Sequence, residues 1–508
     1  MEPETTRSPT SHAGRGKAAP TDTPPEAPAL SNYHSGAWQP ADGVETLDDR
    51  DPASGELTAR VPLSGRAEVA AAVAAARSAQ PEWFAVPPQR RARAIMRLRE
   101  GLVERREELT RLVTADMGKT LTDADGEVGR GIESVEAAIG VPHLLKGESL
   151  EGVAEGVDVE LIRQPVGVVA AITPFNFPAM IPLWFLPFAI ACGNAIVLKP
   201  SERDPRPSEL IFDVIDGIDE IPAGIASLVH GSRDAVNALL DHPGIDAISF
   251  VGQATTARYV AERGAATGKR VQALGGAKNS MVVMPDADLS QAVPAMLASA
   301  FGAAGQRCLA GSVAVIVGDE ARQSEVRDAL AAGARGLETG PGADAATDVP
   351  PLVGPDARDR VADAVERARG IGAEIVVDGL GEASDAGTLL GPTIVETNDP
   401  ESELAREENF GPLLTLVRAG DLGGALEFVN GSRYGNAGSI FTASGAAARR
   451  YRREVEAGMI GINIGVAAPV AWFPFSGWKD SFDGDLHANG RDAVEFYTRK
   501  KTVTSRWA

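Results

Sequence analysis

The hydrophobic and polar positions of the chain fall into two alternating patterns from about residue 32 onward. Apolar residues recur every three or four positions, the spacing of one helix face, over 66–79 and 90–118. Gly118 closes the second of these segments, as glycine does at the C-terminal end of many helices. The pattern therefore predicts helices over both segments.

Short, continuous apolar runs bounded by Pro, Gly or Ser lie between helical segments, which is typical of buried parallel strands. Such runs occupy 167–175, 195–201 and 246–252. The last run passes through Gly252 into the helical segment 253–266. A strand, a glycine turn and a helix form the repeating unit of a doubly wound sheet, so the pattern predicts an α/β fold.

The same alternation begins a second time after Gly276. Further apolar runs, again interleaved with helical stretches, occupy 279–285, 312–318, 373–379 and 413–419. At 508 residues the chain is also too long for one small core. We therefore predict two α/β domains joined near residues 273–279, and we find no repeat of fixed period.

Composition and charge exclude several classes of function. Hydrophobic residues make up 44% of the chain and charged residues 23%, as in soluble globular proteins. The net charge of −21 argues against a sequence-independent nucleic-acid binder and against docking on an anionic membrane. Two cysteines are too few for a disulfide framework, and no Cys/His cluster has metal-ligand spacing. We expect no metal site and a cytoplasmic location.

Two segments need separate comment. The apolar stretch 177–193 contains three prolines and is shorter than the roughly 20 residues of a spanning helix, so we expect it in a core. Residues 1–31 are rich in proline and poor in large apolar residues, which predicts a disordered tail. This tail lacks the apolar region of a secretory signal, and it is too acidic for a transit peptide.

A doubly wound sheet raises the question of a dinucleotide, although the GxGxxG fingerprint is absent from the expected strand–helix context. Gly252 ends a strand and a helix begins at about Gln253, where free backbone N–H groups can hold a pyrophosphate. Lys199 and Glu202 follow another strand, at the edge where open sheets bind ligands. From these residues alone, a turn without ligand and a solvated loop remain the alternatives.

The stretch FGAAGQRCLAGSVAV, residues 301–315, places Cys308 among small residues between apolar segments. Such a thiol is either a buried small residue or a nucleophile that needs the surrounding space. Cys192, the other cysteine, lies inside an apolar run and is interpreted as a buried hydrophobic residue.

Six motifs stand in the order found in the aldehyde dehydrogenase superfamily: PFNFPAMIPLWFLPFAIACGNAIVLKPSER, FVG, GAKN, GQRC, EENFGP and FYTRKKTVTSRW. The resemblance covers roughly residues 35–507, and the chain most closely resembles the CoA-acylating methylmalonate-semialdehyde (malonate-semialdehyde) dehydrogenases. It implies a Rossmann-type NAD-binding domain, an α/β catalytic domain and a small β oligomerisation element. Their expected bounds are, respectively, 32–146 with 166–276, 277–487, and 147–165 with 488–508.

The resemblance assigns the catalytic residues. Cys308 matches the nucleophile that attacks the aldehyde carbon, which gives a thiohemiacetal able to release a hydride. Asn176 matches the side-chain amide that, with the Cys308 backbone N–H, holds the oxyanion. These matches favour catalysis over a buried thiol at Cys308 and over a simple turn residue at Asn176.

The resemblance also implies NAD as the cofactor, with Glu202 on the adenosine ribose favouring NAD over NADP. The expected cofactor-binding residues are Thr173, Phe175, Lys199, Glu202, Gly252, Gln253, Leu274, Glu408 and Phe410. Glu408 matches the carboxylate on the nicotinamide ribose, with Phe410 as the ring beside it. Gln253 departs from the family's usual serine, which puts this pyrophosphate contact in doubt.

Ala273 is the most informative departure. Most hydrolytic aldehyde dehydrogenases carry a glutamate before LGG that activates water, whereas the run here is VQALGGAKN. Without a base, a thiol attacks a thioester better than water does, because its pKa of about 8.5 leaves some thiolate at neutral pH. None of the six histidines is near Cys308 in sequence. Coenzyme A is therefore the expected co-substrate, with an impaired or repurposed enzyme as the alternative.

Two arginines are candidates for binding a substrate carboxylate, which arginine holds through a bidentate fork. Arg307 adjoins the nucleophile, and Arg130 matches an arginine that faces the pocket in the resembled branch. A surface ion pair is the alternative for Arg130.

We therefore predict an NAD-dependent enzyme that converts methylmalonate or malonate semialdehyde to propionyl-CoA or acetyl-CoA through a cysteine thioester. The alternatives are a hydrolytic aldehyde dehydrogenase that releases a free acid and a non-enzymatic descendant of the fold. The stretch 493–507 alternates like a strand with no following strand to pair with, and in the family it joins a sheet across a dimer. We expect a homotetramer that binds no nucleic acid and no membrane.

Overall fold

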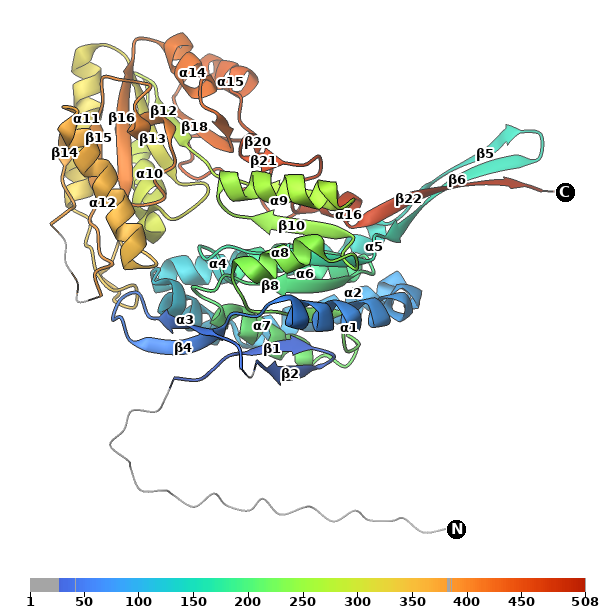
Figure 1. The fold of residues 1–508 in the computed structure, drawn as a ribbon. Coiled ribbons are helices and arrows are strands. Elements are labelled where there is room, and N and C mark those ends of the chain that lie inside the picture. The colour runs from blue at the N-terminus through green and yellow to red at the C-terminus, as the bar shows by residue number, and fades with distance from the viewer. Residues whose placement is uncertain (1–26, 42, 382–383, 385, 508) are drawn as a thin grey trace, which may run out of the picture.

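The computed structural model describes residues 27–41, 43–381, 384 and 386–507, and it has the predicted α/β fold (Figure 1). Most of the predicted tail, residues 1–26, lies outside the described residues. Regular contacts begin before residue 32, because Leu30 is buried and its N–H donates to the Arg60 carbonyl at 2.9 Å.

The first sheet has eight strands and contains the apolar runs predicted near its centre. In spatial order they are β2 (Ala37–Pro40), β1 (Ser31–His34), β9 (Ala226–Leu228), β8 (Ala195–Lys199), β7 (Val168–Ile172), β10 (Ala247–Val251), β11 (Arg270–Leu274) and β21 (Phe482–Asp483). The five strands from β9 to β11 are parallel. Along the chain β8 and β9 are added on one side of β7, and β10 and β11 on the other. The strand order therefore reverses between β7 and β10, which is where doubly wound sheets bind ligands.

The second sheet has seven strands, of which the edge strand β14 is antiparallel. Their order is β14 (Glu374–Val377), β15 (Thr393–Glu396), β16 (Leu413–Ala419), β13 (Gly311–Val317), β12 (Asn279–Val283), β18 (Ala437–Phe441) and β19 (Met459–Ile462). Its two faces belong to different cores, as the alternation of strand side chains requires. In β13, Ala314 and Ile316 face one core, whereas Val313 and Val315 face the other.

Helices cover both sheets (Figure 1). Those before β12 in the chain are α1 (Arg66–Ala85), α2 (Pro88–Glu104), α3 (Arg106–Met117), α4 (Leu121–Ile139), α5 (Val141–Leu144), α6 (Met180–Ala191), α7 (Arg206–Asp216), α8 (Arg233–Asp241) and α9 (Ala254–Ala266). Those after it are α10 (Leu289–Phe301), α11 (Glu320–Arg335), α12 (Pro355–Gly370), α13 (Glu403–Arg406), α14 (Leu422–Asn430), α15 (Gly445–Glu454) and α16 (Gly490–Phe496).

An arm of three antiparallel strands projects from the body (Figure 1). It consists of β5 (Glu148–Ala154), β6 (Val157–Pro165) and β22 (Thr498–Arg506), with β22 paired along the whole length of β6. The strand predicted over 493–507 is thus partly wrong, because residues 493–496 close α16 instead. The apolar residues Val494 and Phe496 are buried in the main core, so a short helix turns the chain before the arm begins. The predicted domain bounds stay a prediction.

The helix predicted over 90–118 is two helices. Arg105, with φ −99° and ψ 13°, ends α2 and begins α3. The break allows α3 to pack against α4 and α7. The predicted end is confirmed, because Gly118 has φ 91°, the left-handed conformation that glycine adopts without strain.

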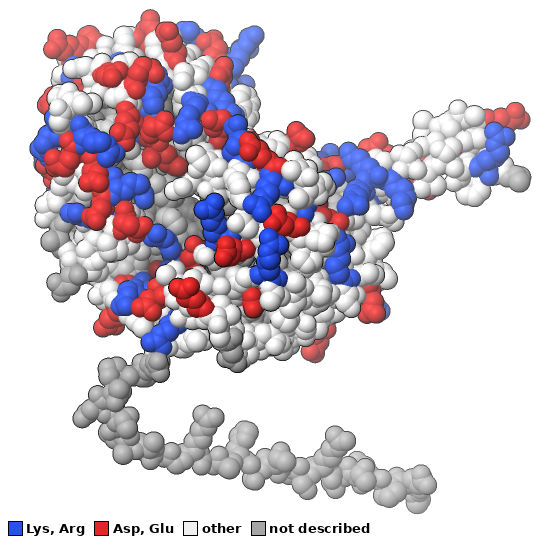
Figure 2. All heavy atoms as spheres, in the orientation of Figure 1, with Lys and Arg blue, Asp and Glu red and all other residues white. Residues whose placement is uncertain are grey.

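The apolar stretch 177–193 forms the buried helix α6, as expected for a core element. No helix in the described part of the chain is both long enough and apolar enough to span a membrane. The net charge of the chain is −21, and over the face that Figure 2 presents, Lys and Arg side chains are interspersed with Asp and Glu.

Candidate active site

Cys308 lies where two cavities meet. One cavity has a volume of about 520 Å³ and is called the large cavity below, and the other, of about 260 Å³, is called the small cavity. Cys308 is the lining residue that the two share among the residues described. A ligand in one cavity and a ligand in the other would therefore both lie next to the Cys308 side chain.

A left-handed turn presents Cys308 between α10 and β13. Ala303 and Ala304 have φ of 50° and 52°, and Gly305 continues the turn at φ 69°. Each alanine in this region costs about 1–2 kcal/mol, so the turn needs outside support. Asp123 on α4 accepts the Ala303 N–H at 3.0 Å and supplies part of it.

The buried Gln306 gives further support. Its Oε1 accepts the N–H of Val353 at 3.0 Å, and its Nε2 donates to the Ala303 carbonyl at 3.3 Å. Because Val353 lines the large cavity, Gln306 links the nucleophile turn to the wall of that cavity.

The surroundings of Cys308 favour its neutral thiol over the thiolate. Burial raises the pKa of its thiol to about 12, and the Glu408 carboxylate acts in the same direction. The backbone N–H groups of Cys308 and Leu309 and the Arg307 guanidinium act against this rise. The sulfur is consequently a neutral thiol at neutral pH.

The Asn176 side chain lies beside the nucleophile turn. It follows β7, is buried, and its Nδ2 donates to the Gln306 carbonyl at 3.1 Å. Its own carbonyl accepts the Lys119 ammonium at 2.8 Å. The Asn176 amide therefore contacts the chain two positions before Cys308, and the predicted oxyanion role needs a donor close to this cysteine.

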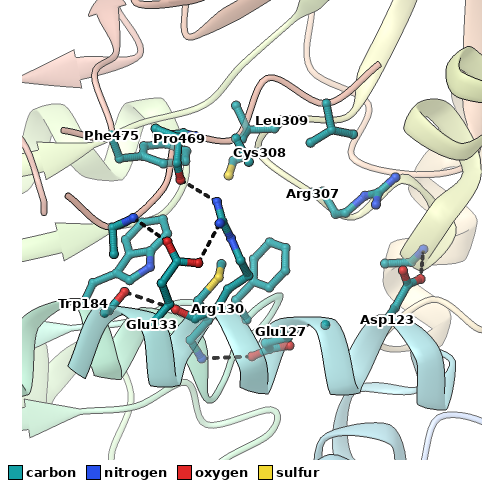
Figure 3. A pocket seen from close by; sticks show the side chains of 18 of the residues that line it. Asp123, Glu127, Arg130, Glu133, Trp184, Arg307, Cys308, Leu309, Pro469 and Phe475 are labelled. Atoms are coloured by element: carbon teal, nitrogen blue, oxygen red, sulfur yellow. Dashed lines mark hydrogen bonds and ion pairs between the residues drawn. The ribbon is translucent and has the colours of Figure 1, made fainter. Parts of the chain in front are cut away.

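The small cavity contains both candidate arginines, and each has a carboxylate nearby (Figure 3). Arg130 points from α4 toward Cys308, donates to Glu133 at 2.7 Å and also bonds the Pro469 carbonyl. Glu133 in turn accepts the Ala471 N–H at 2.9 Å, so this pair ties the segment after β19 to α4. Arg130 therefore forms an ion pair, which was the alternative interpretation, and it also lines the small cavity.

Arg307 points away from Cys308 and toward Asp123 (Figure 3). Its Nη2 bonds the carbonyls of Ala298 and Ser299, the latter at 3.0 Å, near the end of α10. Burial lowers the pKa of Arg307, and the charge of Asp123 opposes this. Its Nε is buried and has no hydrogen-bond partner among the described residues.

A buried ion pair that is not predicted from the sequence lines the small cavity. The Lys119 Nζ and the Glu127 Oε2 lie 2.5 Å apart, and both side chains are almost fully buried. The other Glu127 oxygen accepts the N–H groups of Ala179 and Met180 at the start of α6. A lysine and a glutamate eight residues apart give no local signal, because the pair depends on the turn between α3 and α4.

The large cavity lies at the strand-order reversal of the first sheet. Its lining contains Phe175 and Asn176 after β7, and Gly252 and Gln253 after β10. Gln253 is the N-cap of α9 but makes no side-chain cap, so the first-turn N–H groups remain available to an anion. The sequence prediction of a strand, Gly252 and a helix is confirmed here.

Glu408 lies in the wall of the large cavity, with its carboxylate directly on the turn after β11. Its Oε1 accepts the Ala277 N–H at 2.9 Å, and a Cβ on Gly276 would come within 2.6 Å of Oε2, so a larger residue there would displace the carboxylate. Burial raises the pKa of Glu408 to about 7, although the Ala277 N–H and Lys278 favour the charged form. Phe410 packs edge-on against Phe175 across the same cavity, at 5.7 Å between ring centroids.

The remaining predicted cofactor residues stand behind the cavity wall. Lys199 and Glu202 form an ion pair at 2.8 Å, and the Thr173 N–H donates to the Lys199 carbonyl at 3.1 Å. Leu274 accepts the Gly252 N–H at 3.0 Å. Burial opposes ionisation of Glu202, but Lys199 holds its pKa below the usual range. These four residues do not line the cavity, although their neighbours do.

Ala273 is fully buried in β11 and lines neither cavity. No histidine lines either cavity in the described part of the chain. Within that part, no group of three or more His, Cys, Asp or Glu side chains is arranged to hold a metal ion. The base that activates water in hydrolytic enzymes therefore has no counterpart at Ala273.

Comparison with known proteins agrees with this geometry. Residues 38–503 match the family model described as the aldehyde dehydrogenase family, and the chain belongs to this family. It is 49% identical over 487 residues to malonate-semialdehyde dehydrogenase 1 of Geobacillus kaustophilus (strain HTA426), covering 96% of this chain and 99% of the relative.

Two solved structures are similar throughout. One, from Sinorhizobium meliloti 1021, is assigned to the methylmalonate-semialdehyde dehydrogenases and was solved with NAD; it is 42% identical, with a TM-score of 0.93, covering 96% of this chain and 99% of that one. The other is methylmalonate-semialdehyde dehydrogenase from Oceanimonas doudoroffii, 42% identical, with a TM-score of 0.92 and coverage of 94% and 98%. The predicted family and fold are thus confirmed.

Proposed function

We propose that the protein oxidises malonate semialdehyde and methylmalonate semialdehyde with NAD and delivers the acyl group to coenzyme A. The observation that carries the proposal is the position of Cys308. This residue lines both the small cavity, which contains two arginines, and the large cavity at the strand-order reversal. Relatives named for these semialdehydes support the substrate class.

Cys308 is the proposed nucleophile. Its thiolate adds to the aldehyde carbon, and the charge that develops on the aldehyde oxygen is held by the Asn176 amide and the Cys308 N–H. NAD, when bound, supplies a hydride acceptor. Loss of the hydride from the carbon leaves a thioester on Cys308.

The large cavity fits a dinucleotide. The uncapped N-terminus of α9 suits a pyrophosphate, and the buried Glu408 carboxylate suits the hydroxyls of a ribose. The Lys199–Glu202 pair suits a second ribose, and the charge of Glu202 disfavours a 2′-phosphate there. We assign the same residues as in the sequence analysis to this role, with Thr173, Phe175, Gly252, Gln253, Leu274 and Phe410.

The small cavity fits a carboxylated aldehyde. Arg130 and Arg307 both line it, and a semialdehyde carboxylate between them would receive charge-assisted hydrogen bonds. In this scheme the β-carboxylate leaves as CO2 before thiolysis and its carbon takes up a proton, so methylmalonate semialdehyde yields propionyl-CoA and malonate semialdehyde yields acetyl-CoA.

Deacylation by coenzyme A is testable by rapid mixing. Because Ala273 replaces the water-activating base, hydrolysis of the thioester should be slow, and general-base catalysis is worth roughly 100- to 10,000-fold. Without CoA, one burst of NADH per active site should precede a slow steady state. CoA should accelerate the steady state and yield an acyl-CoA. Rapid turnover to the free acid without CoA would return the assignment to the hydrolytic alternative.

We also propose that the protein is a cytoplasmic homotetramer assembled through its arm. Leu150, Ile162 and Trp507 on the arm are 64%, 37% and 66% exposed, which is unusual for large apolar side chains. β22 pairs with β6 on one side and leaves its other edge open within the described residues. Light scattering at micromolar concentration tests the proposal, and a monomer would contradict it.

A further inference from the structure

The backbone carbonyl of Cys308 accepts hydrogen bonds from two side-chain amides. Asn279, the first residue of β12, donates Nδ2 to it at 2.8 Å, and Asn436, next to β18, donates Nδ2 at 2.7 Å. Both asparagines are buried, with 5% and 4% exposure. Asn279 makes two further hydrogen bonds. Its Nδ2 donates to the Ala310 carbonyl at 2.9 Å, and its Oδ1 accepts the Ala437 N–H at 3.0 Å.

The peptide bond that carries this carbonyl also carries the N–H of Leu309. That N–H, with the N–H of Cys308 itself, favours the charged form of the Cys308 sulfur and so acts to lower its pKa. Hydrogen bonds in a chain polarise one another, because a carbonyl that accepts donors withdraws electron density from its own N–H. The two asparagine amides therefore bind and polarise the peptide whose N–H favours the charged sulfur.

We propose that Asn279 and Asn436 are positioning residues for the nucleophile, which hold and polarise the peptide between Cys308 and Leu309 so that its N–H stabilises the thiolate. The thiohemiacetal step rests on the proposed function, but the effect on the sulfur does not. Both amides are neutral, so they act without adding a charge to either cavity.

Other groups also act on the sulfur, and the test must hold them constant. Among charged side chains, Glu408 disfavours the thiolate and Arg307 favours it. The other ionisable side chains that line the two cavities around it are Lys119, Asp123, Glu127, Arg130, Glu133, Arg203, Asp356, Arg360, Glu407, Arg433 and Tyr434. None of these is altered by an Asn279 or Asn436 substitution.

A purely structural role is the competing explanation, because the asparagines also join the nucleophile segment to β12 and β18. Asn194 provides a matched control. It is fully buried, its Nδ2 donates to the carbonyls of Ala189 and Tyr497, and its Oδ1 accepts the Gly167 N–H at 2.9 Å. It thus makes a similar three-bond clamp in the first sheet without touching Cys308.

The experiment measures alkylation of Cys308 by iodoacetamide as a function of pH in the full-length protein. The only other thiol, Cys192, is 1% exposed, and peptide mass spectrometry separates the two. The variants are Asn436→Leu, Asn436→Ser, Asn279→Ser, the double serine variant and the control Asn194→Leu. Asn436→Ser avoids a large apolar side chain and keeps the test available if the leucine variant does not fold.

We expect alkylation at neutral pH to slow roughly threefold for each lost amide and about tenfold for the double variant, with the pH profile moved to higher pH. Asn194→Leu should lower the unfolding temperature without moving this profile. An unchanged profile in folded Asn436 and Asn279 variants, or an equal shift in the control, would overturn the proposal. If the wild type did not oxidise semialdehydes, the proposed function would fall while this alkylation result would stand.

Discussion

The large and small cavities meet at one sulfur but are built by different means. The large cavity uses strand ends, a helix N-terminus and a glycine-bounded carboxylate, which are features of the sheet itself. The small cavity uses side chains from α4, the nucleophile turn and the segment after β19, including two arginines near carboxylates. Under the proposed function, the sheet would hold the dinucleotide, and a few side chains of the small cavity would decide which aldehyde is accepted.

Cys308→Ser should stop catalysis at the point where the two cavities meet. A hydroxyl without a base is a much weaker nucleophile than a thiolate, so NADH formation from any aldehyde should fall by at least about a thousandfold. NAD affinity, measured by calorimetry, should stay within roughly twofold of wild type, because cofactor contacts lie elsewhere in the large cavity. Near-normal turnover would remove Cys308 from the mechanism.

Arg307→Ala should separate the contribution of the small cavity to activity from that of the large cavity. Relative to propanal, kcat/KM for malonate semialdehyde should fall about ten- to hundredfold more, because only the carboxylated substrate needs the guanidinium. Arg307→Lys keeps the charge but loses the fork, and it should lie between the two. Some loss on both substrates is expected from the bonds to Ala298 and Ser299, but equal losses would make Arg307 purely structural.

Glu202→Gln tests the proposed adenosine-ribose contact behind the wall of the large cavity. Lys199 holds the pKa of Glu202 below its usual range, so the carboxylate is ionised throughout the physiological range and repels a 2′-phosphate. Removing the charge should reduce the preference for NAD over NADP by about tenfold. The ratio of kcat/KM values for the two cofactors measures the effect. An unchanged ratio would show that Glu202 does not discriminate between them.

The pH dependence of NAD binding offers the smallest expected effect. Since burial raises the pKa of Glu408 to about 7, its carboxylate becomes protonated as the pH falls through neutrality and then accepts hydroxyl hydrogen bonds less well. The NAD Kd should rise severalfold between about pH 8 and about pH 6. Glu408→Gln should bind weakly at both values with little dependence on pH. A wild-type Kd that is flat over this interval would contradict the role of Glu408.

The sequence predicted the large cavity better than the small one, for a physical reason. Strand runs, Gly252 and the start of α9 are local patterns, and parallel topology brings their ends together. The Arg130–Glu133–Ala471 link and the two amides on the Cys308 carbonyl join residues far apart in the chain, so no local spacing reveals them. Asn279 stood in the motif GAKN, but its contact with Cys308 required the structure.

The helix break at Arg105 and the helical residues 493–496 were missed for a related reason. Apolar periodicity continues through both places, and what changes is the direction in which the chain must run to reach its packing partners. Tertiary packing therefore decided these boundaries against the local pattern.

The raised pKa of Cys308 has a consequence for the resting enzyme. Peroxide and other oxidants attack thiolates, and a thiol with a pKa of about 12 offers very few of them at neutral pH. Burial and the Glu408 charge, which disfavour the thiolate, therefore lower the oxidation rate expected for this sulfur. Cys192, whose pKa burial also raises to about 12, is protected in the same way. Both sulfurs of the chain are therefore held mainly as thiols at neutral pH.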